Sequence, residues 1–165
     1  MSERRRDLSH QPERFPYYRS VAPLLWALVA IGGTELVVEH FLLWLWKPLV
    51  AAAISALTLV ALGWLVLTIC SMRRLPVELG EDTLVMRVGI LKAVSVPLAN
   101  VAGLRSSWDA ETLKRPSVRN FALLSYPNIV VDLKEPLPDR RGTAVIAHRL
   151  DDPAGFARSM AKRLG

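Results

Sequence analysis

The feature that most constrains this chain is the run from Leu49 to Cys70, which contains no charged side chain. At about 1.5 Å per residue, a helix of this length would extend roughly 33 Å, which matches the roughly 30 Å hydrocarbon core of a bilayer. The run therefore predicts a membrane-spanning helix, which we place at residues 49–71.

A second apolar run, at residues 21–46, precedes this span and also predicts a membrane-spanning helix. Only Lys47 and Pro48 separate the two runs. Proline suits the first turn of a helix, because the N–H that it lacks would have no intrahelical partner there. A connection this short predicts that the two helices form an antiparallel hairpin.

The charged residues around the two runs predict the orientation of the hairpin. The link offers only Lys47, whereas the second span ends at Arg73 and Arg74, and residues 1–20 form a basic segment with five arginines. Because positive charge accumulates on the cytoplasmic side, we expect two spans in a bacterial inner membrane and both termini in the cytoplasm. A cleaved signal peptide competes with this interpretation, but no small-x-small site precedes a soluble segment. Aromatic residues fit the inner boundary (Tyr17, Tyr18) and the outer boundary (Trp44, Trp46).

Two carboxyl groups interrupt the first span. Glu35 and Glu39 are four residues apart and share one helix face, with His40 about 100° further round. In an antiparallel hairpin they lie level with Ser55 and Thr58 of the second span, so we expect the carboxyl groups to face these hydroxyl groups. Two acids and a histidine have the composition of a metal site, but one hairpin supplies at most three such ligands, and we assign no metal.

Several interpretations of this polar site stay open. The carboxyl groups could be protonated and hydrogen-bonded across the hairpin or across a homodimer. Alternatively, Glu39 and His40 could lie at the outer interface, if the span ends at Val38. The site could also dock a partner subunit, or carry ion or proton chemistry.

From Leu75 onward, short alternating runs broken by turn residues predict a small β domain over residues 75–164. Two loops, at residues 107–119 and 135–142, separate the later strands. The expected strands are residues 77–79, 83–88, 91–96, 101–106, 120–126, 128–134 and 143–148.

The chain ends in a predicted helix at residues 152–164. Asp152 suits the N-cap and Pro153 suits the first helical position. Short strands followed by one amphipathic helix suggest a small β-barrel capped by that helix, and thus an α+β membrane protein. Apolar residues of the helix recur at intervals of four, at Phe156, Met160 and Leu164.

Residues 84–91, followed by residues 95–101, resemble the hairpin and the "I-P-L-x-x-I" step of bacterial pleckstrin-homology-like domains. Such domains often follow a transmembrane hairpin, and the resemblance covers residues 75–164. It implies a split β-barrel with a C-terminal helix and no catalytic residues. The sequence shows no arginine–lysine signature that would extend phosphoinositide binding to this chain.

Sequence motifs of catalysis are absent. The chain contains no phosphate-binding glycine loop, G-x-S-x-G, H-E-x-x-H or paired C-x-x-C, and the single Cys70 cannot form an internal disulfide. We expect His148 to be a surface residue, and Asp151 and Asp152 to cap a helix. We therefore assign no catalytic residue and no cofactor, and expect the protein not to be an enzyme.

Basic residues outside the hairpin predict what the domain contacts. The net charge is +6, and beside hydrophobic spans such a charge indicates attraction to anionic lipid of the inner leaflet. Ordinary solvated charge is the alternative, and the anchor argues against nucleic acid. The candidate residues are Arg73, Arg74, Trp108, Lys114, Arg115, Arg119, Arg140 and Arg141.

Two functions follow from these features. The leading hypothesis is a non-enzymatic, membrane-anchored interaction or scaffold module that contacts the inner leaflet or a partner membrane complex. The alternative is a small accessory subunit of a transport or electron-transfer assembly, which would use Glu35, Glu39 and His40. In both, the hairpin would contact a protein partner or a second copy of the chain.

Overall fold

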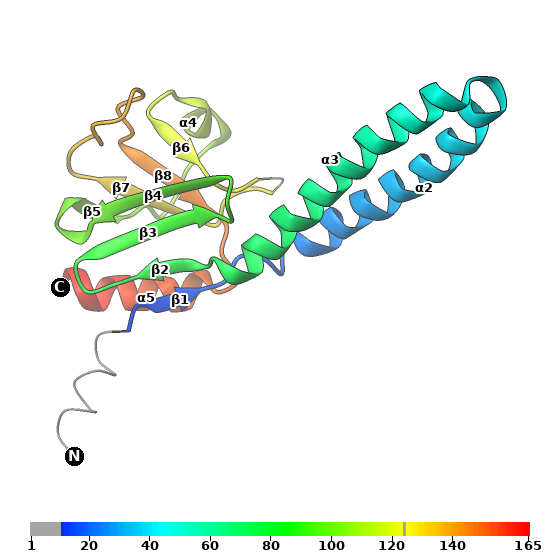
Figure 1. The fold of residues 1–165 in the computed structure, drawn as a ribbon. Coiled ribbons are helices and arrows are strands. Elements are labelled where there is room, and N and C mark those ends of the chain that lie inside the picture. The colour runs from blue at the N-terminus through cyan, green and yellow to red at the C-terminus, as the bar shows by residue number, and fades with distance from the viewer. Residues whose placement is uncertain (1–10, 124) are drawn as a thin grey trace, which may run out of the picture.

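The computed structural model describes residues 11–123 and 125–165, which form a helical hairpin and a β domain with a C-terminal helix (Figure 1). The predicted α+β class and the order of hairpin, strands and helix are confirmed. Residues 1–10, half of the predicted basic segment, lie outside the described residues.

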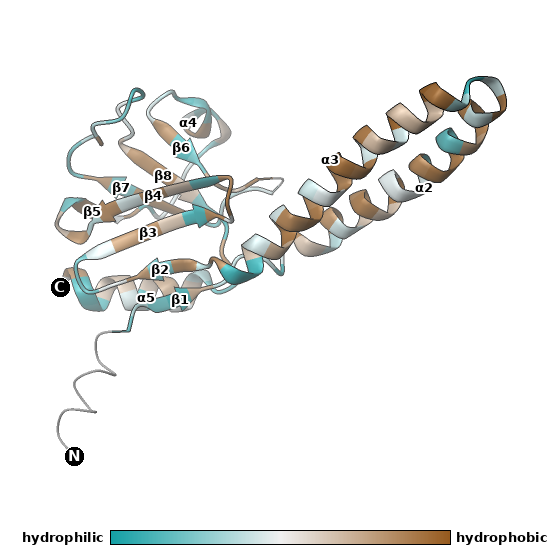
Figure 2. Ribbon diagram, viewed as in Figure 1, coloured by the Kyte–Doolittle hydropathy of each residue, from teal (hydrophilic) through white to brown (hydrophobic). Residues whose placement is uncertain are grey.

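The hairpin consists of α2 (Ala22–Trp46) and α3 (Pro48–Arg74). Both helices are long and apolar enough to cross a membrane, and Figure 2 shows apolar residues along most of their length. They approach closely at Gly32, where a Cβ atom would lie 2.9 Å from Leu62 Cδ2. Lys47 alone joins them, in an extended conformation.

The first sheet contains strands β1 to β4 in sequence order, and all its pairs are antiparallel. Strand β1 precedes the hairpin and its neighbour β2 follows it, so the hairpin is an insertion between two paired strands. The sequence does not predict β1, because three residues alternate too briefly to give a pattern. The strands are β1 (Glu13–Phe15), β2 (Val77–Leu79), β3 (Thr83–Val88) and β4 (Lys92–Pro97).

The second sheet has the order β5-β7-β8-β6, in which β6 runs parallel to β8 and the other pairs are antiparallel. The 3-10 helix η2 (Leu98–Asn100) connects the two sheets. Among the described residues the two sheets stay separate, so the predicted small β-barrel does not close. The strands are β5 (Val101–Leu104), β6 (Val118–Asn120), β7 (Ile129–Leu133) and β8 (Val145–His148).

Two segments differ from their predicted conformations. In place of the strand expected at residues 120–126, strand β6 covers Val118–Asn120 and stops there, because the Asn120 side chain accepts a hydrogen bond from the Ala122 N–H and turns the backbone. The expected loop at residues 107–119 contains helix α4 (Ala110–Lys114), which Asp109 caps through the Thr112 N–H.

Helix α5 (Pro153–Leu164) confirms the predicted N-cap, since Asp152 Oδ1 accepts a hydrogen bond of 2.8 Å from the Gly155 N–H. Phe156 is buried and its ring meets Phe15 of β1 edge to face at 5.1 Å. Met160 is also buried, whereas Leu164 lies exposed at the end of the helix and does not extend the predicted apolar face.

A continuous hydrophobic core joins the hairpin to the β domain. Tyr17 lies in this core with 3% of its surface exposed, so protein covers the side chain that was predicted to belong to an aromatic belt. Its hydroxyl group donates to the Leu75 carbonyl oxygen at 3.1 Å and accepts from the Gly89 N–H at 2.5 Å. Burial raises the pKa of Tyr17. Ser71 of α3 also accepts a hydrogen bond from the Ile90 N–H, so two consecutive residues of the β3–β4 turn are bonded to the joint.

His148 lies beside this joint and is 1% exposed, which corrects the expected surface position. Its ring is 5.0 Å from the ring of Tyr17 and 5.8 Å from that of Phe121. The contacts assign the proton to Nε2, which donates to the Arg87 carbonyl oxygen, while Nδ1 accepts from the Arg149 N–H. Burial lowers the pKa of His148, so the ring is neutral in the folded protein.

Gly89→Ala should destabilise the joint more than Gly142→Ala. Both glycines have positive φ angles, 48° and 57°, so an alanine costs about 1–2 kcal/mol at either position. Only at residue 89 would the new Cβ atom also meet Ser71 Oγ at 2.3 Å; at residue 142 it would meet nothing within 4 Å. Thermal unfolding in detergent measures the difference, and equal losses would contradict this account of the joint.

The stability of the β domain should fall as the pH drops below about 6.5, the ordinary pKa of histidine. The unfolded chain binds a proton at His148 before the folded chain does, so acid favours unfolding over this range, and the contribution is fully present above it. His148→Phe should cost about 1–3 kcal/mol at pH 7.5 but flatten the acid-side dependence. Parallel pH profiles for the two proteins would show that another group is responsible.

Candidate functional site

The polar residues of the hairpin are arranged differently from the prediction. His40 is the residue that contacts α3, through a 2.7 Å hydrogen bond between its Nδ1 atom and Ser55 Oγ. Thr58 donates to the Ile54 carbonyl oxygen of its own helix. Glu35 and Glu39 are exposed and do not face these hydroxyl groups. Residue spacing placed the groups at similar levels, but the rotation of α2 about its axis depends on how the helices pack.

An apolar groove of about 580 Å³ runs along one flank of the hairpin. The hydrogen-bonded His40 and Ser55 are the polar residues of its lining. The His40 and Trp44 rings are 5.7 Å apart. At 100° per residue, Glu35 and Glu39 lie on the other flank of α2. The residues that line the groove are Leu36, Val37, His40, Phe41, Trp44, Ser55 and Leu59.

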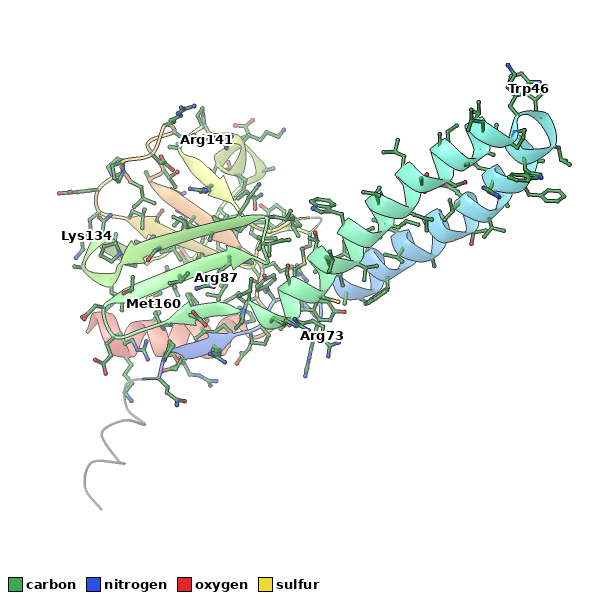
Figure 3. The ribbon with its side chains drawn as sticks, viewed as in Figure 1. Trp46, Arg73, Arg87, Lys134, Arg141 and Met160 are labelled. Carbon is green, nitrogen blue, oxygen red and sulfur yellow. The ribbon has the colours of Figure 1, made fainter. Side chains whose placement is uncertain are left out.

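Arg73 and Arg74 end α3 where the hairpin meets the domain, and both are exposed. The Arg73 guanidinium carbon lies 5.7 Å from the centre of the Tyr18 ring, and the Tyr18 hydroxyl oxygen accepts a 2.9 Å hydrogen bond from Trp26 Nε1. The Tyr18 ring therefore lies next to both the Arg73 cation and the Trp26 ring at this end of the hairpin. Figure 3 shows Arg73 at the joint and Trp46 at the far tip of the hairpin.

Trp108 packs with Leu113 against a small apolar cluster of the second sheet that includes Val118 and Val130, so its role in the structure is to hold α4. Lys114 and Arg115 are exposed at and just after the end of α4. These three predicted residues do not line the pocket that contains Arg119.

Arg119, Arg140 and Arg141 line one cavity of about 310 Å³, which we call the seam pocket. Lys92 on β4 and the pair Arg119 and Asn120 on β6 come from the strands at the ends of their respective sheets. The β7–β8 connection supplies Asp139, Arg140 and Arg141. The pocket thus lies where the two sheets fail to close. Its lining is Lys92, Arg119, Asn120, Asp139, Arg140 and Arg141.

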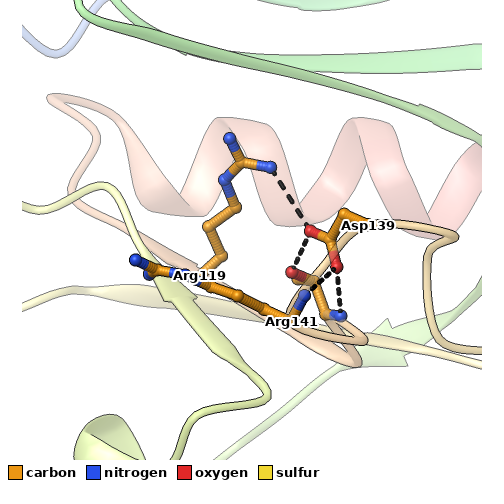
Figure 4. A network of polar contacts seen from close by, with 4 residues as sticks. Arg119, Asp139 and Arg141 are labelled. Carbon is orange, nitrogen blue, oxygen red and sulfur yellow. Dashed lines mark hydrogen bonds and ion pairs between the residues drawn. The ribbon is translucent and has the colours of Figure 1, made fainter.

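Asp139 fixes the β7–β8 connection (Figure 4). Its carboxylate accepts hydrogen bonds from Thr143 Oγ1 at 2.5 Å, the Thr143 N–H at 2.9 Å and the Arg141 N–H at 3.2 Å. Arg119 Nη1 lies 3.5 Å from the same carboxylate. The two Thr143 hydrogen bonds, with smaller contributions from Arg141 and Arg119, lower the pKa of Asp139, so the carboxylate is ionised at neutral pH.

Three lining residues of the seam pocket were not predicted from the sequence: Lys92, Asn120 and Asp139. No local pattern connects Lys92 with the β7–β8 connection, because the three segments meet only through the arrangement of the two sheets. A signal did exist for Asp139, since an aspartate before Arg140, Arg141 and Gly142 is typical of a turn that the aspartate side chain closes.

Comparison of the chain with protein-family models, curated protein sequences and solved structures found no match.

Proposed function

We propose that this chain is a non-enzymatic, membrane-anchored interaction module, with α2 and α3 spanning a bacterial inner membrane and the β domain held against the cytoplasmic leaflet. The stretch from Trp26 to Trp46 is about 30 Å long at 1.5 Å per residue, which matches the hydrocarbon core and puts aromatic side chains at both boundaries. Arg73 and Arg74 at the domain end favour the cytoplasmic side.

The observation that carries this proposal is the exposed apolar tip of the β3–β4 turn. Ile90 is 60% exposed and lines a shallow cavity with Leu67 and Arg74 of α3. In the antiparallel hairpin Leu67 lies near the level of Trp26, at the inner end of the span. An isoleucine at this level would contact acyl chains, while Arg74 reaches the headgroups.

The pleckstrin-homology-like resemblance is part of the same proposal. An antiparallel four-stranded sheet, a second sheet and a C-terminal helix that packs on the first sheet support a split-barrel relationship. The β domain would then serve as a binding surface, and the hairpin would determine which side of it faces the bilayer. Its partners would be anionic lipids and proteins of the same membrane.

A fluorophore at residue 90 tests the contact with the leaflet. In a Cys70→Ala background, Ile90→Cys labelled with an environment-sensitive dye should show blue-shifted emission in nanodiscs and strong quenching by shallow spin-labelled lipids. The matched control is Lys134→Cys, an exposed position that Figure 3 places at the end of the domain away from the hairpin. Equal quenching at both positions, or none at residue 90, would contradict the proposed orientation.

A second candidate function, an accessory subunit of a membrane assembly, is favoured by the exposure of Glu35 and Glu39. Each lies well inside α2, and a charge near the bilayer centre costs a few kcal/mol on insertion scales. A polar surface on a partner helix would remove this cost. The His40–Ser55 pair is already satisfied within the hairpin, so the carboxyl groups are the better docking residues.

The variant Glu35→Gln/Glu39→Gln should leave insertion intact and dissociate the chain from its assembly, because neutral amides no longer require the same partner. Blue native electrophoresis after mild solubilisation measures the size of the complex. Glu111→Gln/Glu135→Gln, which removes two exposed carboxylates from the β domain, is the matched control. An unchanged complex in the first variant would remove this second function.

A further inference from the structure

We propose that the seam pocket binds a phosphomonoester group. Four cations, from Lys92, Arg119, Arg140 and Arg141, line it against the single carboxylate of Asp139. This inference deepens the proposed function by naming the ligand class of the basic surface. Only the assignment of the phosphate to a membrane lipid rests on that proposed function. Binding of a free phosphate needs no contact with the leaflet.

Three of the four cations of the seam pocket differ in their pairing from Arg87, Arg105 and Arg163 of the same domain. Arg87 contacts Glu78 at 3.1 Å and Arg105 contacts Asp132 at 2.7 Å, while Arg163 contacts Glu13 at 2.8 Å. Within residues 11–123 and 125–165, by contrast, the side chains of Lys92, Arg140 and Arg141 form no ion pair. Repulsion among the like charges raises the free energy of the empty pocket, and a bound anion would lower it.

The pocket is built before a ligand arrives. Asp139 and Thr143 hold the β7–β8 connection, and the Thr143 residue is itself fully buried. Arg119 is held on one side by Asp139 and on the other by the Phe121 ring, whose centre is 5.5 Å from the guanidinium carbon. A guanidinium group held in this way loses less entropy when it binds an anion.

The donors of the pocket suit a phosphomonoester better than a carboxylate. The carbonyl oxygen of the Asn120 side chain is occupied by the Ala122 N–H, so this side chain offers its amide N–H groups to a ligand. A phosphomonoester carries close to two negative charges and presents three terminal oxygens, which can accept from several arginine and amide donors together. One carboxylate would leave most of these donors and cations unsatisfied.

The phosphomonoester could belong to a lipid headgroup, as in phosphatidic acid, or to a free phosphate compound. In Figure 3, Arg141 lies on the side of the domain opposite Met160 of α5, and the hairpin leaves the domain toward this side. This placement favours the lipid, because the pocket and the hairpin then face the same leaflet.

Two probes applied to the full-length protein in detergent test the inference and separate the sources. Calorimetric titration with inorganic phosphate measures binding of the free group. Native mass spectrometry after incubation with equimolar phosphatidic acid and phosphatidylglycerol measures selection of a lipid phosphomonoester over a phosphodiester. We expect phosphatidic acid to be retained in preference, and phosphate to bind more weakly at the same site.

The variant Arg140→Gln/Arg141→Gln should reduce binding of both probes at least about tenfold, since two charge-assisted hydrogen bonds to the phosphate are lost. Both side chains are exposed, so the change spares the fold. The matched control is Arg158→Gln/Lys162→Gln, which removes two exposed cations from α5 and should leave binding unchanged.

The outcomes separate clearly. Pocket-dependent retention of phosphatidic acid alone supports a headgroup site, and pocket-dependent binding of inorganic phosphate as well supports a site that also takes free phosphate compounds. Equal losses in the pocket and control variants would mean nonspecific charge attraction and would overturn the inference, as would the absence of both binding signals. A positive result in detergent would stand even if the residue 90 fluorophore showed no contact with lipid, so the two proposals fail separately.

Discussion

The arrangement of the whole molecule depends on the buried hydroxyl group of Tyr17. It donates to Leu75 at the end of α3 and accepts from Gly89 in the β3–β4 turn, so this one side chain links the hairpin to the first sheet. Leaving the buried Gly89 N–H without its partner would cost about 1–3 kcal/mol, which favours a single geometry at the joint. Without that rigidity the hairpin would tether the β domain but would not orient it.

The order of elements along the chain supports the same rigidity. Because β1 and β2 pair directly, with Phe15 opposite Val77, the segment that enters the hairpin lies beside the segment that leaves it. Asp151, just before α5, accepts hydrogen bonds from the Arg19 and Ser20 N–H groups at 3.1 and 3.2 Å. The start of the first long helix is thus fixed by residues from both ends of the β domain, and the proposed surfaces keep a defined position relative to the hairpin.

Sequence patterns predicted the elements well where local chemistry decides them. The strands at Val77–Leu79 and Thr83–Val88, the two long helices and the Asp152 cap follow from alternation, apolar length and capping. The prediction failed where a partner distant in sequence decides the outcome. Strand β1 forms because it pairs with β2, which lies about 60 residues later in the chain. His148 is buried because the rings of Tyr17 and Phe121 cover it. The candidate site was half predictable: Arg119, Arg140 and Arg141 were recognised by charge, but nothing local joined them to Lys92.

The sequence by itself determined that this chain has two long apolar helices, joined by a short link, before a small β domain and an amphipathic C-terminal helix. These features depend on hydrophobic length and on interactions between near neighbours, which a linear pattern records. Only the tertiary structure decided which face of α2 meets α3, and thus that His40 is paired while Glu35 and Glu39 are exposed. It also decided that the two sheets remain open and gather four cations at the seam, because rotation about a helix axis and the closure of a sheet depend on packing between distant segments.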